Sequence, residues 1–189
     1  MTRARAAMRW LALALLCLVS THGRAQEARP ESLPEYVLKA GFLYNFAKYV
    51  EWPAEAFASP DAPISIGVVG RDPFGPDLER TLGDKSVKNR RFEVRRYSDL
   101  AQLEPVHILF VPQTERERVA RILKRVERLP VLTVGEDEQF SEGGGVVTIL
   151  IRDSRPRLHI NVAAAEEQQL AIAPKLLRIA TIVTRGDRR

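Results

Sequence analysis

The stretch ISIGVVGRDPFG, residues 64–75, decides the fold expected for this chain. Residues 64–69 form a short, almost continuously apolar run, which is typical of a strand buried on both faces of a parallel sheet. Glycines, an aspartate and a proline follow directly and predict a tight turn. Residues 76–82 then have the pattern of a short helix. A buried strand, a turn and a helix together form the repeating unit of an α/β domain.

Strand and helix patterns continue to alternate beyond this unit. The expected strands are residues 92–97, 106–111, 131–134, 146–151 and 157–162, and the expected helices are 115–128, 163–170 and 174–183. The last two strands flank a turn at Asp153 and Ser154, which predicts an antiparallel hairpin. We therefore expect a single three-layer α/β domain, with a mostly parallel sheet, an antiparallel edge hairpin and flanking helices.

A helical pattern also precedes the first strand, over residues 36–53, and Pro53 is expected to end it. Apolar residues lie on more than one side of this helix, and one of its stripes contains Phe42, Phe46 and Tyr49. Such a broad apolar circumference has two explanations. Either other layers of the same domain cover it, or part of it meets a second protein chain.

The first 25 residues have the layout of a secretory signal peptide. A basic start is followed by an apolar run at residues 10–19 and by the small residues Gly23 and Ala25. The run is shorter than the ~20 residues that a membrane span needs. We therefore expect export and cleavage after Ala25, and an uncleaved anchor is the alternative. A flexible leader is expected at 26–35 and the domain at 36–185.

Loss of this segment changes the charge of the chain. The 189 residues carry 29 basic and 24 acidic side chains, but residues 1–25 contain four arginines and no acid, so the remaining 164 carry 25 and 24. A nearly neutral chain has no long-range attraction for phosphate polymers, so no nucleic-acid partner is expected. The only cysteine, Cys17, is also lost, which leaves no disulfide, thiol nucleophile or thiolate metal ligand.

Motifs for catalysis are missing from the sequence. It has no His-Glu-x-x-His pair, no Gly-Lys-Ser/Thr phosphate loop and no Gly-x-Ser-x-Gly turn. His107 opens a buried strand and is interpreted as structural. We therefore expect no enzyme activity, no catalytic residue, no metal and no cofactor.

Two places could bind an anion. Arg71 follows the strand at 64–69, where open parallel sheets bind ligands, although a tight turn with Phe74 packed inward explains the same residues. Arg157 and His159 are two residues apart on an expected strand and therefore share a face. Together they could hold a carboxylate or a phosphate of a small ligand. The alternative is an exposed charged face without a ligand.

Five segments together resemble the YfiR-like family of bacterial periplasmic proteins. They are KAGFLYNFAKYVEWP (39–53), IGVVGRDPFG (66–75), HILFV (107–111), PVLTVGE with the later Phe140 and GGG (130–145), and RLHINVAAAEEQQLAIAPKLLRIA (157–180). The segments occur in the order of the family and cover nearly all of the chain that follows the expected signal peptide.

The resemblance implies a periplasmic α/β domain that forms a homodimer and acts as a regulator. Well-known members bind the periplasmic domain of an inner-membrane diguanylate cyclase and repress it, which lowers cyclic di-GMP and limits biofilm formation. Release often involves an outer-membrane lipoprotein, which is therefore a further implied partner. Well-known members also use cysteine pairs for stability and redox sensing. The chain without its signal peptide has no cysteine, so redox control of that kind is excluded.

The expected contact surface combines exposed parts of the first helix and of the closing helix. Its residues are Phe42, Phe46, Tyr49, Leu177 and Ile182. Large apolar side chains of this kind often dominate the energy of protein interfaces. The alternative function is a periplasmic small-molecule binding or sensory module that is linked to a sensor kinase or an outer-membrane uptake system.

Overall fold

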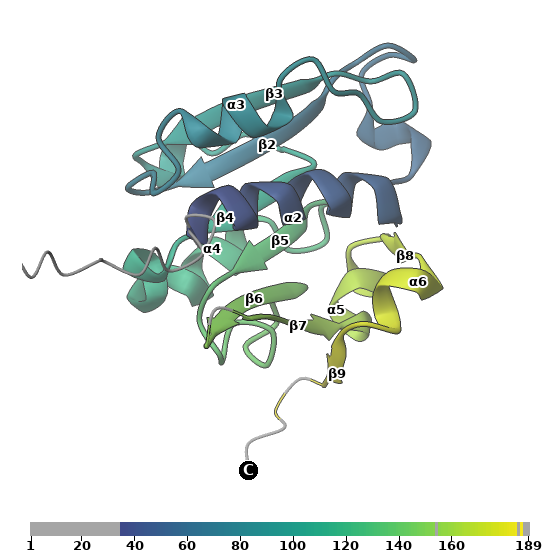
Figure 1. Cartoon of the computed structure of the whole chain (residues 1–189). Coiled ribbons are helices and arrows are strands. Elements are labelled where there is room, and N and C mark those ends of the chain that lie inside the picture. Colours follow the sequence, from purple (N-terminus) through teal and green to yellow (C-terminus); the bar gives the residue numbers. More distant parts are fainter. Residues whose placement is uncertain (1–34, 154, 185, 187–189) are drawn as a thin grey trace, which may run out of the picture. The chain divides into compact units, whose positions relative to one another are not determined.

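The computed structural model of the chain describes residues 35–153, 155–184 and 186 (Figure 1). The expected signal peptide and all of the expected leader except Glu35 lie outside the described residues. The described residues group into one compact unit. No helix in the described part is both long and apolar enough to cross a membrane.

A seven-stranded sheet forms the centre of this unit, with the strand order β3-β2-β4-β5-β6-β7-β9. Its strands are β2 (Ile64–Val69), β3 (Phe92–Tyr97), β4 (Ile108–Val111), β5 (Leu132–Gly135), β6 (Val147–Arg152), β7 (Arg155–Asn161) and β9 (Thr181–Val183). All neighbours pair in parallel except β6 and β7, which form the expected antiparallel hairpin. A second, two-stranded antiparallel sheet joins β1 (Val50–Glu51) to β8 (Ala171–Ile172).

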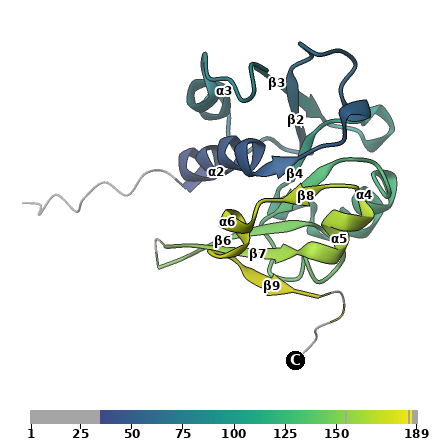
Figure 2. The same ribbon diagram turned by 90° about the vertical axis from the view of Figure 1, so that its right-hand side faces the viewer.

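Helices lie on both faces of the large sheet (Figures 1 and 2). They are α2 (Glu35–Tyr49), α3 (Asp77–Leu82), α4 (Val119–Arg125), α5 (Val162–Glu167) and α6 (Pro174–Leu177), with 3₁₀ turns η1 (Ala54–Ala56), η2 (Leu100–Gln102) and η3 (Gln113–Arg118). Ile66 and Val68 of β2 belong to the core formed with α2 and α3, whereas Val69 belongs to the core formed with α4. Alternate residues of one strand therefore enter two cores, and the expected three-layer α/β fold is confirmed.

Helix α2 is covered on several sides by its own domain. The Tyr36 ring packs edge-on against Phe74 beyond β2, with 5.4 Å between ring centroids. The Tyr44 ring packs similarly against Phe92 of β3, at 5.8 Å. Phe46 is fully buried in the core. The expectation that Phe46 belongs to an exposed contact surface is therefore wrong, because the sheet already uses that side of the helix.

Two expected helix ends differ from the structure because short strands replace them. The first helix ends at Tyr49, and Val50 and Glu51 pair with β8. The expected closing helix at 174–183 is wrong beyond Leu177, because Thr181–Val183 form β9 and pair with β7. Consecutive β-branched residues favour a strand once a neighbouring strand can pair with them. Ile182 therefore lies on a strand.

Candidate functional site

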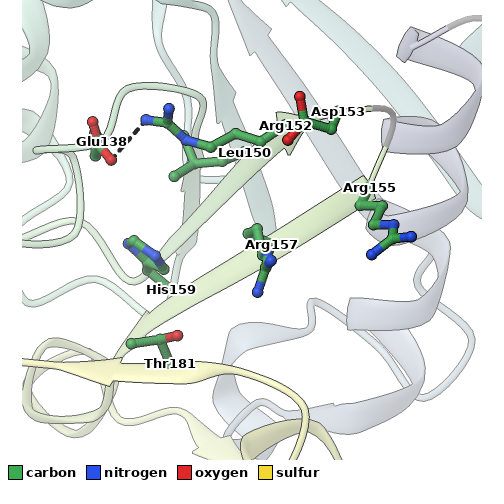
Figure 3. A pocket seen from close by; sticks show the side chains of 8 residues that line it. All are labelled: Glu138, Leu150, Arg152, Asp153, Arg155, Arg157, His159 and Thr181. Atoms are coloured by element: carbon green, nitrogen blue, oxygen red, sulfur yellow. Dashed lines mark hydrogen bonds and ion pairs between the residues drawn. The ribbon is translucent and has the colours of Figure 1, made fainter.

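An open hollow lies on one face of β6, β7 and β9 (Figure 3). It measures about 610 Å³ and is lined by Glu138, Leu150, Arg152, Asp153, Arg155, Arg157, His159 and Thr181. The ladder places Arg157 opposite Leu150, and His159 opposite Thr181 on the other side. The prediction that Arg157 and His159 share a face is therefore confirmed. Ligand binding by these residues stays a prediction.

Three arginines and two acidic residues line the hollow, so basic side chains are in excess. Arg152 donates a hydrogen bond from Nη2 to Oε1 of Glu138, at 2.7 Å. Arg155 lies directly opposite Arg152 in the ladder, and like charges in that arrangement destabilise a sheet. The side chains of Arg155 and Arg157 form no ion pair or hydrogen bond with any residue that the structure describes. The hollow therefore contains two guanidinium groups, those of Arg155 and Arg157, that no described residue neutralises.

The strands below the hollow are anchored in the core. Leu158 and Ile160 of β7 point to the opposite face and are buried with α2. Leu150 lies beneath the charged side chains and is only 9% exposed. Nδ1 of His159 is also buried, and it has no hydrogen-bond partner among the residues that the structure describes. One polar atom of the lining is thus left unsatisfied.

Arg71 does not line this hollow. It is exposed in the turn after β2, at the point where the chain leaves β2 for β3 on one side and β4 lies on the other. Gly70 and Gly75 both have positive φ, of 77° and 53°. Phe74 is buried, with its ring centroid 4.7 Å from that of Phe110. The tight-turn interpretation is therefore confirmed, and anion binding by Arg71 stays a prediction.

A buried ion pair at the same edge of the sheet was not foreseen from the sequence. Lys39 of α2 donates to Glu136, just after β5, and each side chain is only 3% exposed. The second oxygen of Glu136 accepts from the backbone N–H of Gln113, at 2.8 Å. Burial and the neighbouring Glu136 raise the pKa of Tyr36 to about 12. The only sequence signal is that Lys39 stands among apolar residues of the helix.

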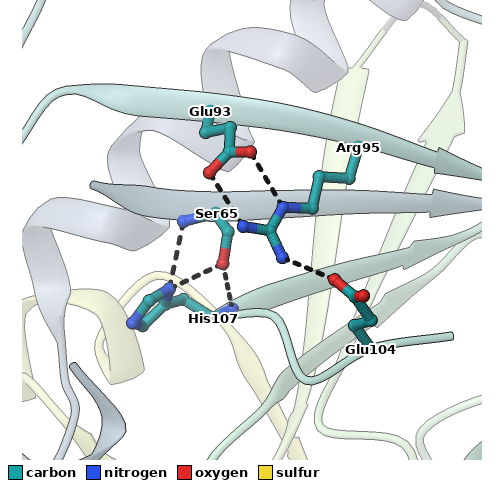
Figure 4. A network of polar contacts seen from close by, with 5 residues as sticks. All are labelled: Ser65, Glu93, Arg95, Glu104 and His107. Atoms are coloured by element: carbon teal, nitrogen blue, oxygen red, sulfur yellow. Dashed lines mark hydrogen bonds and ion pairs between the residues drawn. The ribbon is translucent and has the colours of Figure 1, made fainter. Parts of the chain in front are cut away.

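His107 lies at the opposite, amino edge of the sheet (Figure 4). Its Nδ1 accepts from the backbone N–H of Ser65 at 3.0 Å and contacts the Ser65 hydroxyl at 2.8 Å. The Phe57 ring stacks on the imidazole, with 4.3 Å between centroids. Burial lowers the pKa of His107. Ser65 is buried as well, so the structural interpretation of His107 is confirmed.

The polar side chains beside this pair in Figure 4 belong to an ion-pair network. Arg95 of β3 donates to both oxygens of Glu93 at 3.0 Å, and its Nη1 donates to Glu104 at 3.1 Å. The two-pronged hydrogen bond to Arg95 lowers the pKa of Glu93. All charges of this group are paired, so it has no free cation to offer a ligand.

Exposed apolar side chains are concentrated after α6. Ile179 is 69% exposed and Ile182 is 49% exposed, and they are the large exposed hydrophobic residues of the described part. Of the other expected contact residues, Phe42, Tyr49 and Leu177 are half-buried and pack against the core. Ile179 was missed because the closing segment was expected to be a helix. Its only sequence signal is that Ile179 belongs to a mostly apolar segment, residues 176–183.

Comparison with known proteins identifies the family of the chain. The model of the YfiR/HmsC-like family matches residues 36–181, so the chain belongs to this family of regulatory proteins. A solved structure of a conserved domain protein from Vibrio cholerae O1 biovar El Tor str. N16961 is similar in fold, with 12% identity and a TM-score of 0.54. The similarity covers 78% of this chain and 60% of that one. A search of curated proteins gives no match.

Proposed function

We propose that the protein is a periplasmic regulator that binds the periplasmic domain of an inner-membrane diguanylate cyclase and represses it. Repression would lower cyclic di-GMP and limit biofilm formation. The observation that carries the proposal is the family match, which spans residues 36–181 and thus almost all of the described chain. Exposed Ile179 and Ile182 support it, because each presents a large apolar side chain that a protein partner can cover.

The proposed mechanism is a population shift in the cyclase. A bound protein represses its partner only if its affinity for the inactive arrangement exceeds its affinity for the active one. We include a homodimer in the proposal, together with an outer-membrane lipoprotein that releases repression. Because Cys17 is the only cysteine of the sequence, a releasing signal that oxidises a pair of thiols within one chain is excluded.

Ile179 and Ile182 form the centre of the proposed contact surface, and Phe42, Tyr49 and Leu177 form its half-buried margin. Ile182→Glu places a charge on this exposed surface without disturbing the core. We expect it to weaken binding of the cyclase at least about tenfold, as for the loss of an interface hot spot. Pull-down from the membrane fraction and the cellular level of cyclic di-GMP measure the effect.

Ala120→Glu is the matched control, because Ala120 is exposed on α4 and also exchanges an apolar side chain for a carboxylate. The control should bind and repress as the natural protein does. Unchanged repression by Ile182→Glu would contradict the contact surface. A deletion strain whose cyclic di-GMP level equals that of its parent would contradict the function itself.

The hollow on β6, β7 and β9 favours a second candidate function. A cationic hollow suits a small-molecule binding or sensory module that reports to a sensor kinase or an outer-membrane uptake system. Gene neighbourhood separates the two functions. An adjacent membrane protein with a cyclase domain supports the first, whereas an adjacent kinase or receptor supports the second.

A further inference from the structure

We propose that the hollow on β6, β7 and β9 binds a small, soluble anion that carries more than one phosphate group. The inference concerns a ligand of the domain itself, so it stands whether or not the protein represses a cyclase. The residues that would hold the anion are Arg152, Arg155 and Arg157.

The positions of the three arginines favour a ligand with more than one negatively charged group. Arg155 and Arg157 are two residues apart on β7 and share a face, so their Cα atoms are about 6.6 Å apart along the strand. Arg152 lies directly across the ladder from Arg155. Figure 3 shows the three side chains around the same hollow. A single small monoanion can pair with one guanidinium, whereas a ligand with two phosphate groups can pair with two or more.

The acidic residues of the lining do not remove this charge. Glu138 is engaged by Arg152, at 2.7 Å. Asp153 belongs to the turn between the strands and has a positive φ of 50°. No described acidic side chain pairs with Arg155 or Arg157. The two guanidinium groups are therefore free to form two-pronged hydrogen bonds with phosphate oxygens.

Folding stability does not explain the cluster. Arg152 and Arg155 lie directly opposite each other in the ladder, where like charges do not stabilise a sheet, and the surrounding core does not need their side chains. Arg152 extends toward Glu138 (Figure 3), so Arg155 and Arg157 are the cations left to pair with an anion.

The size of the hollow favours a small molecule. Its volume of about 610 Å³ lies within the range of sites for small ligands. Leu150 supplies an apolar floor and Thr181 a hydroxyl group at the side of β9, so a small organic part can accompany the phosphates. The nearly neutral charge of residues 26–189 gives the protein no general attraction for polyanions.

Calorimetric titration of the purified protein with inorganic pyrophosphate tests the proposal. We expect saturable binding of one pyrophosphate per chain that weakens as the salt concentration rises. The double variant Arg155→Gln/Arg157→Gln should bind at least about tenfold more weakly, because it loses both free guanidinium groups. The control variant Arg116→Gln/Arg121→Gln loses the same charge from exposed positions of η3 and α4, and should bind as the natural protein does.

Two single variants complete the experiment. Arg157→Gln and Arg157→Lys replace one exposed side chain each, so a failure of the double variant to fold leaves the site testable. The lysine variant should bind more weakly than the natural protein, because it keeps the charge but loses the planar guanidinium group that donates two parallel hydrogen bonds. Absence of pyrophosphate binding, equal losses in both double variants, or binding to phosphatidylglycerol vesicles without binding to pyrophosphate would each overturn the proposal.

Discussion

Lys39 and Glu136 form an ion pair that is almost completely removed from water, although they are 97 residues apart in the sequence. The pair joins α2 to the loop after β5 and, through the backbone of Gln113, to the segment after β4. Two buried charges need one another, because neither can recover the solvation that it lost. The pair therefore holds the first helix in one position on the sheet.

Lys39→Met should destabilise the protein by about 3–5 kcal/mol, because it leaves the Glu136 carboxylate buried without its cation. Lys39→Met/Glu136→Gln should lose less, since it removes both charges. The free energy of unfolding in urea, measured for both variants and the natural protein, gives the comparison. A double variant less stable than Lys39→Met would contradict the view that the unpaired Glu136 carboxylate is the main cost of that substitution.

The buried imidazole of His107 makes stability depend on pH. Its pKa is below the ordinary value of 6.5, because burial disfavours the charged ring. The unfolded chain therefore binds the proton more readily, and stability should fall as the pH drops from about 6.5 through the lower, folded-state pKa. His107→Asn keeps an acceptor for the Ser65 N–H and cannot take up the proton. Urea unfolding at several pH values should show a flatter profile for this variant, and parallel profiles would count against the assignment.

At the scale of elements, the loop before β6 is shaped by one phenylalanine. A Cβ atom on Gly145 would lie 2.2 Å from the Phe140 ring, and one on Gly135 would lie 2.3 Å from it. The buried ring therefore occupies the space that two side chains would need. The glycines here serve close packing between the loop and the end of β5.

Two glycine-to-alanine substitutions should have opposite effects. Gly145→Ala should cost about 1–3 kcal/mol, since Phe140 must leave its place in the core. Gly41→Ala should raise stability by about 0.5–1 kcal/mol, because Gly41 lies within α2 and a Cβ there meets no atom within 4 Å. Thermal unfolding of both variants measures the difference. A destabilised Gly41→Ala would indicate that the helix needs the flexibility of that residue.

Elements with a strong local pattern were predictable from the sequence. The strands at 64–69 and 92–97 have the expected bounds, because an apolar run and an alternating run each indicate a strand without reference to the rest of the chain. β1, β8 and β9 were not predictable in this way. Each has only two or three residues, and each exists because a distant strand pairs with it.

The candidate site residues also divide into those that a local pattern predicts and those that depend on distant pairing. The spacing of Arg157 and His159 on one strand was enough to place them on a common face. Arg152 and Arg155 joined them only through the register of the hairpin, which local patterns do not determine. Lys39 stands among apolar residues of a helix, and its partner Glu136 is too distant in sequence for any local pattern to link the two.

At the scale of the whole molecule, the end of the chain connects its two sheets. β8 pairs with β1, which follows the first helix, and β9 pairs with β7. Leu176 of α6, between these strands, is buried in the core. Residues 171–183 therefore hold together the beginning and the end of the described fold.

A chain that ends at Leu170 should lose at least about 1.5–3 kcal/mol of stability, which is the value of burying one leucine. It should also associate, because loss of β9 exposes the edge of β7 to other chains. Urea unfolding and light scattering over a range of concentrations measure the two effects. A shortened chain that is as stable and as monodisperse as the natural protein would refute this role of the closing segment.

The three residues of β9 present side chains on both faces of the sheet. Thr181 looks into the hollow, while Ile182 pairs with Ile160 and is exposed on the other side of the sheet. Because β9 has only three residues, its order depends on the residues and molecules that contact it. A molecule that rigidifies it from one side therefore lowers the entropy that a molecule on the reverse side must still lose. The proposed anion site and the proposed partner surface therefore lie on opposite faces of the same strand.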